Sequence, residues 1–306
     1  MLRCLVALFL LLASAGAIDL PKDGQPILFL GDSITHSGQY VDDFELFLAV
    51  KYPDQKFTVI DCGLPSETVS GLSEAGHAGG KFPRPDLHER LDRVLATVKP
   101  KLVFACYGMN CGIYLPFDEA RFAKYREGIE RLRAKVKAAG AEIVHLTPPI
   151  FDPLPLKGRV VPPNLAKDGQ QSENYDEVLT RYSAWLVEQG KTQGWTVIDV
   201  HSAMAKVLQE ARRSDPTFTF AKDGVHANEA GHHVIASAIV AAFDVPFDFD
   251  STGYTPMHAA IRQRGRILTD AYLSAAGHQR PGMSKGLPLP EAQAKAAAIV
   301  IPSAPK

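Results

Sequence analysis

The sequence is poor in cysteine and nearly neutral in charge, and both shortages exclude classes of protein. Only 4 of the 306 residues are cysteine, which is too few for a fold held together by a disulfide framework. The 33 basic and 34 acidic residues give a formal net charge of -1, so the chain lacks the basic field that nucleic-acid-binding proteins use to neutralise phosphates. We therefore expect no nucleic-acid partner. The 46% apolar and 22% charged residues also exclude a disordered or collagen-like chain.

Long apolar runs are scarce as well. The run Leu5–Leu12 is much shorter than the about 20 residues that a membrane-spanning helix needs. Arg3 precedes it, and the small residues Ala15-Gly16-Ala17 follow it as they do before a signal-peptidase site. We predict that residues 1–17 are a signal peptide and that the mature chain is exported; a retained membrane anchor is the alternative. Ile18 stands where a lipoprotein would have cysteine, so lipid attachment is not expected.

Cleavage at that site would remove Cys4 and leave Cys62, Cys106 and Cys111 in an oxidising compartment. An odd number of cysteines implies at least one unpaired thiol. A local disulfide between Cys106 and Cys111 is one possibility. Three buried free thiols that pack as small apolar side chains are the other.

Short apolar runs alternate with longer amphipathic segments from about residue 26 to residue 243. This alternation is typical of a parallel sheet with crossover helices. The runs predict strands at Pro26–Leu30, Lys56–Ile60, Leu102–Cys106, Glu142–Leu146 and Thr196–Val200. The segments between them predict helices at Tyr40–Val50, Pro85–Val98, Asp118–Ala139, Glu173–Glu188 and Asn228–Phe243, with Gly140 and Gly190 as C-terminal stops.

The domain boundary is predicted close to residue 247. We assign residues 18–247 to one α/β domain and residues 248–306 to a C-terminal helical extension packed on it, with Met257–Ala276 as the docking helix. Two long Pro- and Gly-rich connections, 64–84 and 147–171, follow the second and fourth strands. Ligands bind at that edge of open α/β sheets, so these loops are either a substrate surface or plain surface decoration.

A serine stands directly after the first predicted strand, in the segment GDSIT. At this point of a doubly wound sheet a side chain faces the ligand crevice, and the N–H groups of the following helix favour a developing negative charge. Thr35 takes the place of the last glycine of G-x-S-x-G, and neither G-x-x-x-x-G-K-[ST] nor G-x-G-x-x-G occurs. The α/β-hydrolase elbow and the nucleotide-binding loops are therefore not predicted, and Ser33 is a candidate nucleophile.

Candidate partners for this serine follow later strands. Asp223 and His226 place a carboxylate and an imidazole on one loop; such an acid orients the ring while its other nitrogen takes the serine proton. Gly63 and Asn110 follow the second and third strands, and a backbone N–H and an Asn amide are the donors that an acyl-transfer site aims at an oxyanion. Taken singly, each of these residues also fits a turn, a cap or a surface position.

Together these residues resemble the four sequence blocks of the SGNH hydrolases, also called GDSL esterases. Ser33 lies in GDSIT, Gly63 in DCGLPSET, Asn110 in YGMNC, and Asp223 and His226 in DGVH, in family order and at family-like separations. The long loops and the C-terminal stretch resemble an exported bacterial subgroup. The resemblance implies a flavodoxin-like, three-layer α/β/α fold with a five-stranded parallel sheet in the order 2-1-3-4-5.

The resemblance also implies a role for each residue. Ser33 is the nucleophile, His226 the base and Asp223 the residue that orients it; the oxyanion hole is formed by the Ser33 N–H, the Gly63 N–H and the Asn110 side chain. No cofactor or metal is implied. Cys111 departs from the family pattern, which usually has Asp after the Asn. We expect the loop to be supported differently and the activity to survive.

The implied activity is that of a serine esterase acting through an acyl-enzyme. Among family substrates, O-acetyl groups on carbohydrate are favoured because a small acyl group needs no apolar tunnel and polar loops can hold sugar hydroxyls. The alternatives are a lipase or lysophospholipase, and a carbohydrate-binding protein that keeps the fold without turnover. A metal site of Asp223, His226, His232 and His233 is disfavoured, because the two adjacent histidines should point away from each other on one helix.

Overall fold

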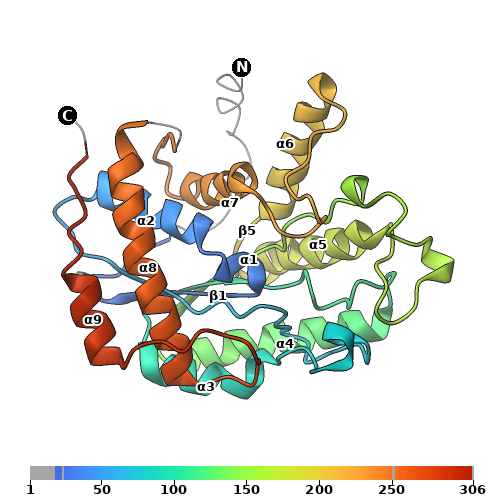
Figure 1. Cartoon of the computed structure of the whole chain (residues 1–306), viewed down its shortest axis with the longest axis horizontal. Coiled ribbons are helices and arrows are strands. Elements are labelled where there is room, and N and C mark those ends of the chain that lie inside the picture. The colour runs from blue at the N-terminus through green and yellow to red at the C-terminus, as the bar shows by residue number, and fades with distance from the viewer. Residues whose placement is uncertain (1–17, 23, 250–251, 305–306) are drawn as a thin grey trace.

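The centre of the molecule is a sheet of five parallel strands (Figure 1). The computed structural model describes residues 18–22, 24–249 and 252–304, and the predicted signal peptide lies outside them. The strands are β1 (Pro26–Gly31), β2 (Thr58–Asp61), β3 (Leu102–Cys106), β4 (Glu142–Leu146) and β5 (Thr196–Ile198). Their spatial order, β2-β1-β3-β4-β5, confirms the predicted sheet.

Helices surround this sheet. They are α1 (Ser33–His36), α2 (Gln39–Lys51), α3 (Leu87–Val98), α4 (Glu119–Ala138), α5 (Tyr175–Gln193), α6 (Val200–Ser214), α7 (Glu229–Ala241), α8 (Thr255–Ala276) and α9 (Leu289–Ala297). In Figure 1, α2 and α7 lie on one side of the sheet and α3 and α4 on the other. The arrangement is therefore the predicted three-layer fold, with the carboxyl ends of all the strands at one edge.

The end of the fifth strand was predicted wrongly. The apolar run suggested a strand up to Val200, but β5 ends at Ile198 and Val200 begins α6. Asp199 causes the change, because its side chain accepts a hydrogen bond from the Ser202 N–H at 3.0 Å and so caps the helix. Helices α1, α6 and α9 are absent from the predicted set.

One of the two predicted glycine stops is also wrong. Gly140 does follow the end of α4, with φ 77°. Gly190 instead lies inside α5, which ends at Gly194 in the left-handed conformation with φ 66°. A Cβ at Gly190 would come within 3.3 Å of the Trp195 carbonyl oxygen, so this glycine allows the chain to turn back closely after the helix.

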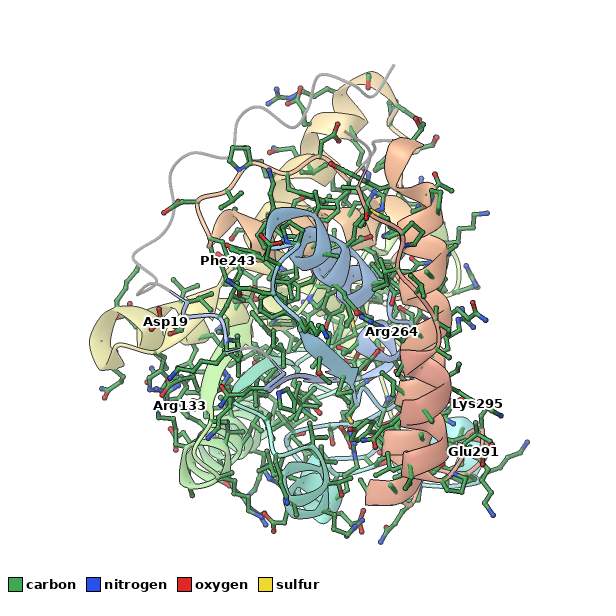
Figure 2. The ribbon with its side chains drawn as sticks, turned by 90° about the vertical axis from the view of Figure 1, so that its left-hand side faces the viewer. Asp19, Arg133, Phe243, Arg264, Glu291 and Lys295 are labelled. Atoms are coloured by element: carbon green, nitrogen blue, oxygen red, sulfur yellow. The ribbon has the colours of Figure 1, made fainter. Side chains whose placement is uncertain are left out.

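Helix α8 covers the edge of the sheet at β2. It packs against β2, α2 and α3, and Figure 2 shows it along one side of the molecule. Ile261 on its apolar face is fully buried. On its polar face Arg264 pairs with Glu45 of α2, and His258 Nε2 lies 2.7 Å from Asp43 Oδ1. Helix α8 thus has both apolar and charged contacts with the sheet region.

The three described cysteines are buried free thiols. The structure therefore bears out free thiols and not a bridge between Cys106 and Cys111. Burial raises the pKa of the Cys62 and Cys111 thiols to about 12, so these side chains pack as neutral groups at neutral pH. Among the residues in 18–304 that the structure describes, no helix is long and apolar enough to cross a bilayer.

Candidate active site

The serine of GDSIT is the first residue of α1, directly after β1. Asp32 caps this helix, because its Oδ1 accepts a hydrogen bond from the Ile34 N–H at 3.0 Å. Burial raises the pKa of the Asp32 carboxyl to about 6, although this hydrogen bond opposes the shift. Ser33 thus lies at the carboxyl end of a central strand, beside N–H groups that have no partner within the helix.

The structure brings the predicted serine, histidine and aspartate together. His226 Nε2 lies 2.8 Å from Ser33 Oγ, across 193 positions of sequence. His226 Nδ1 lies 2.6 Å from Asp223 Oδ2. Asp223 Oδ1 accepts the backbone N–H groups of His226 at 2.8 Å and Val225 at 3.0 Å. The carboxylate is therefore held with one oxygen on Nδ1, which favours the tautomer whose Nε2 can accept the serine proton.

This group of side chains is open to solvent. The Asp223 and His226 side chains are each 53% exposed, whereas Ser33 is half-buried. Partial burial disfavours ionised Asp223, but the hydrogen bonds from His226 and from the Val225 N–H outweigh it and hold the pKa of this carboxyl below its ordinary value. Asp223 is therefore ionised at neutral pH. Because the two side chains are exposed, a bulky ester can approach the serine.

Asn110 lies on the loop after β3 and is 4% exposed. Its Oδ1 accepts hydrogen bonds from Arg84 Nη1 at 2.9 Å and from the Tyr114 hydroxyl at 3.1 Å. Its Nδ2 donates to the Glu67 carbonyl at 3.3 Å. Because a carboxamide has two N–H donors, one hydrogen remains for a further acceptor on the side away from Arg84 and Tyr114.

Two neighbours shape the loop that carries Asn110. The Tyr175 hydroxyl accepts the Gly112 N–H at 3.1 Å and donates to the Met109 carbonyl at 2.8 Å. Gly108 has φ 150°, and a Cβ there would lie 2.6 Å from Pro148 Cβ. The loop is therefore clamped on both sides of Asn110.

The N–H of Gly63, which was predicted to be an oxyanion donor, has a hydrogen-bond partner in this structure. Its N–H donates to Asp61 Oδ1 at 2.7 Å, so this hydrogen is not available to an oxyanion in this conformation. A Cβ at Gly63 would overlap the backbone of α1, at the His36 nitrogen and, at 2.9 Å, the Thr35 carbonyl carbon. The missing side chain therefore lets the loop after β2 lie directly against the helix that carries the serine.

Replacing Gly63 by Ala is expected to displace that helix. Backbone cannot move aside as the end of a flexible side chain can, so we expect a loss of about 1–3 kcal/mol in the free energy of unfolding. A shift of the serine by about 1 Å would lower kcat about 100-fold. Thermal unfolding and ester hydrolysis would measure both effects. Gly76→Ala is the matched control, since its Cβ would meet only Gly169 Cα at 3.7 Å; equal kcat in the two variants would contradict the expectation.

Ser66 is a site candidate that the sequence analysis missed. Its φ is 70°, a conformation that residues other than glycine rarely adopt. None of the residues that the structure describes accepts a hydrogen bond from its N–H. The next residue, Glu67, contacts the Asn110 amide through its carbonyl. The Ser66 N–H is thus a donor without a partner among the described residues, in the residue next to the one whose carbonyl contacts Asn110.

Two charged residues of the 64–84 loop were missed as well. Arg84 is 9% and Glu74 7% exposed, and they form an ion pair of 2.7 Å. Through the Arg84 contact with Asn110 the loop forms part of the wall of the site. This part of the loop is therefore not surface decoration.

Cys111, the departure from the family pattern, is completely buried against the same loop. The Ser70 hydroxyl donates to its carbonyl at 3.4 Å. Cys111 thus joins the loop after β3 to the 64–84 loop without a carboxylate.

The histidines considered for a metal site have separate partners. His232 Nε2 lies 3.0 Å from Ser37 Oγ, whereas His233 Nε2 lies 3.6 Å from Asp43 Oδ2. In the described part of the chain, no group of three or more His, Cys, Asp or Glu side chains could hold a metal ion. The geometry therefore offers nothing in favour of the metal hypothesis.

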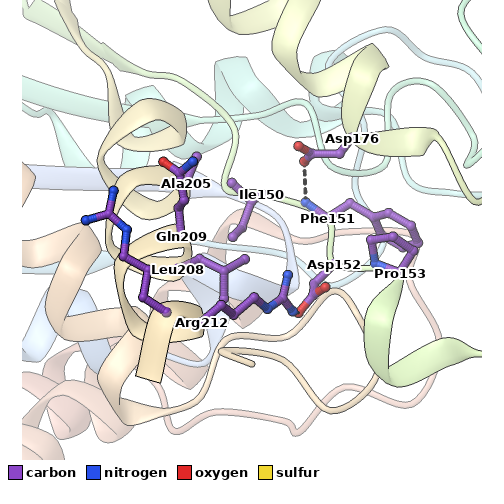
Figure 3. Close-up of a pocket in the computed structure, with 10 residues that line it drawn as sticks. Ile150, Phe151, Asp152, Pro153, Asp176, Ala205, Leu208, Gln209 and Arg212 are labelled. Carbon is purple, nitrogen blue, oxygen red and sulfur yellow. Dashed lines mark hydrogen bonds and ion pairs between the residues drawn. The ribbon is translucent and has the colours of Figure 1, made fainter. Parts of the chain in front are cut away.

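The 147–171 loop supports the segment that carries Asp223 and His226. The Asp152 N–H donates to the Gly224 carbonyl at 2.9 Å, and its Oδ2 accepts Arg212 Nη2 and the Thr219 hydroxyl, each at 2.6 Å. Figure 3 shows Asp152 and Arg212 meeting at the wall of a cavity of about 430 Å³. This cavity, and a second of about 500 Å³ beside α7 and α8, are lined by other residues than Ser33, His226 and Asn110.

Comparison with known proteins identifies a family. A model of the GDSL-like lipase/acylhydrolase family matches residues 29–234, a span that contains every site residue described above. A search of curated proteins finds no match.

Several solved structures are similar. A gut microbial diltiazem-metabolizing enzyme, BT4096, has a TM-score of 0.57 and 24% identity over 75% of this chain, which spans about half of that protein (49%). A catalytic mutant of Axe2, an acetylxylan esterase from Geobacillus stearothermophilus, has a TM-score of 0.53 and 20% identity, with 74% of this chain and 97% of that one covered. The acetyl xylan esterase AlAXEase has a TM-score of 0.50 and 17% identity, with 71% and 98% covered. At these identities the likeness concerns the fold.

Proposed function

The chain belongs to the GDSL-like lipase/acylhydrolase family, and we propose that it is a serine esterase that removes small acyl groups, above all O-acetyl groups, from carbohydrate. The observation that supports this most is the hydrogen-bonded series of Ser33, His226 and Asp223, at 2.8 Å and 2.6 Å. Serine and imidazole within hydrogen-bond reach, with the imidazole oriented by a carboxylate, are the arrangement that activates a hydroxyl nucleophile.

In the proposed reaction Ser33 Oγ attacks the ester carbonyl carbon while His226 Nε2 takes the serine proton. The C–O bond to the alcohol breaks, and His226 returns that proton to the leaving oxygen, so that the acyl group remains on Ser33. Water then attacks the acyl-enzyme, again losing its proton to His226. The acid leaves and Ser33 regains its proton, while Asp223 stabilises the imidazolium in both steps.

We assign the oxyanion hole to the Ser33 N–H, the Ser66 N–H and the second Nδ2 hydrogen of Asn110. Ser66 replaces Gly63 of the original prediction because the Gly63 N–H is bonded to Asp61. Pre-oriented donors of this kind stabilise charge that develops only in the transition state.

The openness of the site supports a short acyl group on a bulky alcohol. The Asp223 and His226 side chains are 53% exposed, and the cavities of about 430 and 500 Å³ are lined by other residues than Ser33 and His226. Two of the similar structures are acetylxylan esterases, which supports an acetylated carbohydrate. We also propose that residues 1–17 direct export and are then removed.

Hydrolysis of p-nitrophenyl esters of increasing acyl length tests the proposal, with Ser33→Ala as the blank. We expect turnover that is highest with acetate, declines with chain length and disappears in Ser33→Ala. Release of acetate from an acetylated xylo-oligosaccharide should follow the same pattern. The carbohydrate control is the same oligosaccharide without acetyl groups.

Other outcomes would favour the alternatives. Preference for long acyl chains would favour a lipase or lysophospholipase. Binding of the acetylated oligosaccharide without turnover, equal in the wild type and Ser33→Ala, would favour a carbohydrate-binding protein. Turnover that persists in Ser33→Ala would contradict the proposed nucleophile.

A further inference from the structure

We infer that the buried ion pair between Glu74 and Arg84 sets the orientation of the Asn110 carboxamide and so aims its free N–H at the oxyanion. Both charged residues belong to the 64–84 loop, and neither touches Ser33, His226 or Asp223 through any hydrogen bond among the described residues. They are therefore positioning residues. This inference rests on the proposed function, in which Asn110 is an oxyanion donor.

The two contacts with Glu74 fix the orientation of the Arg84 guanidinium. Arg84 Nε and Nη2 donate to Glu74 Oε2 and Oε1, each at 2.7 Å. A guanidinium is planar and its donors form a rigid fork, so fixing two of its nitrogens fixes the third. That third nitrogen, Nη1, donates to Asn110 Oδ1 at 2.9 Å.

The Asn110 amide is held in one of its two orientations by this contact. Its Oδ1 receives donors from both Arg84 and Tyr114, while its Nδ2 donates to the Glu67 carbonyl. A flipped amide would turn its N–H groups toward the Arg84 guanidinium, which can only donate, and its oxygen toward the Glu67 carbonyl, which can only accept, so both of these hydrogen bonds would be lost. At a site where Asn110 is 4% exposed, water cannot easily replace them.

The charge of the arginine also strengthens Asn110 as a donor. A cationic hydrogen bond on Oδ1 polarises the amide and makes the opposite N–H groups more acidic. The carboxylate of Glu74 keeps the buried cation compensated. Cys111 supplies no charge here, since burial raises the pKa of its thiol to about 12. The loop pair therefore places a compensated cation directly on Asn110 Oδ1.

A double variant tests the inference without leaving a buried charge. Glu74→Gln combined with Arg84→Met removes both charges and the donor to Asn110 while keeping similar side-chain size. The control is Glu45→Gln combined with Arg264→Met, a pair between α2 and α8 whose side chains are also largely buried, 6% and 23% exposed. Tyr114→Phe removes the second donor to Asn110 and leaves the ion pair intact.

Two measurements report on the oxyanion hole. One is kcat and KM for p-nitrophenyl acetate. The other is the rate at which a fluorophosphonate modifies the serine: Ser33 Oγ attacks phosphorus, fluoride leaves, His226 takes the serine proton, and a phosphonyl oxygen occupies the hole. This reaction needs no knowledge of the natural ester. Thermal unfolding of each variant shows whether the fold is retained.

We expect the Glu74→Gln/Arg84→Met variant to lose about 10- to 100-fold in kcat and in labelling rate, with KM changed less than about twofold. Tyr114→Phe should lose about threefold. The control pair should lower the melting temperature and leave both rates unchanged.

Other results would contradict either the positioning role or the proposed function. If the double variant is labelled as fast as the wild type, the positioning role is overturned and the proposed function is left intact. Rates in the double variant that fall only as far as in the control pair would show a purely structural ion pair, which also overturns it. A wild-type protein whose Ser33 is not labelled at all would contradict the proposed function itself, and the inference that rests on it would be wrong too.

Discussion

Replacing Asp223 by Asn is expected to lower kcat about 10⁴-fold and to leave KM within about twofold of the wild type. An amide has nearly the shape of the carboxylate, so the loop and the distance from His226 to Ser33 should change little. The negative charge that stabilises the imidazolium is lost, however, and the amide N–H can donate to Nδ1. His226 then carries its proton on Nε2, which can no longer accept the proton of Ser33.

The measurement is the steady-state hydrolysis of p-nitrophenyl acetate by the variant. Asp215→Asn is the matched control. Asp215 lies on the turn before the loop that carries Asp223, and its carboxylate accepts hydrogen bonds from the Thr217 N–H at 2.9 Å and the Thr217 hydroxyl at 2.6 Å instead of from His226. It should retain full activity. If Asp223→Asn kept more than about a tenth of the wild-type kcat, the contact of 2.6 Å between Asp223 and His226 would not have the role given to it.

The sheet could be predicted from the sequence because its strands are short apolar runs buried on both faces, and this pattern depends only on local residues. One error occurs where a polar side chain overrides that pattern. Asp199 interrupts an apolar run and starts α6 one residue later, a competition between capping and strand formation that hydrophobicity does not report. Gly190 was predicted to end its helix. The structure gives another reason for glycine there, since the backbone at Trp195 passes close to it.

The site could be predicted only as far as its residues stand at strand ends. Ser33 and Asn110 follow β1 and β3, and Asp223 and His226 lie three positions apart on one loop, so topology alone brings them near one another. Gly63 shows the limit of this reasoning. Glycine at this position is compatible both with a backbone N–H that faces an oxyanion and with a close approach of backbone, and only the structure shows which contacts it makes.

The residues that were missed depend on how a long loop folds. Arg84 and Glu74 are ten positions apart, and Arg84 reaches Asn110 across 26 positions, so no local pattern connects them. Ser66 is missed for another reason: its donor is a backbone N–H, and the feature that singles it out is a positive φ. The type of side chain does not predict a backbone conformation of this kind.

Removing residues 248–306 is expected to leave a chain that does not fold stably. We therefore propose that the extension is a separate segment of the sequence but that the α/β domain depends on it for stability. The apolar side chains of α8 that it would remove are each at most 9% exposed: Met257, Ile261, Leu268, Tyr272 and Leu273. Burying one such side chain contributes about 1.5–3 kcal/mol, so together they contribute on the order of 10 kcal/mol. That is comparable with the whole stability of a typical domain, about 5–15 kcal/mol.

Charge adds to this effect. On α2, Asp43 would lose His258 at 2.7 Å and keep His233 at 3.6 Å, whereas Glu45 would lose Arg264. The repulsion between these neighbouring carboxylates would therefore be less compensated than in the full chain. The extension also reaches the candidate active site, because Arg280 Nε donates to the Pro65 carbonyl at 2.9 Å, next to Ser66. Even a truncated chain that folded would therefore have lost a support of the proposed oxyanion hole.

Soluble yield, size-exclusion chromatography and thermal unfolding of the truncated chain measure this expectation. Two point variants of the full chain calibrate it: Ile261→Ala should lower the free energy of unfolding by about 2–5 kcal/mol, whereas Gln263→Ala, on the exposed side of the same helix, should change it by less than about 0.5 kcal/mol. This expectation would be contradicted if a chain of residues 18–247 were soluble and monomeric and unfolded at the same temperature as the full-length protein. In that event the edge strand β2 would have to be stable without the helix that covers it, because the unpaired N–H and C=O groups of an exposed edge otherwise favour association with other chains.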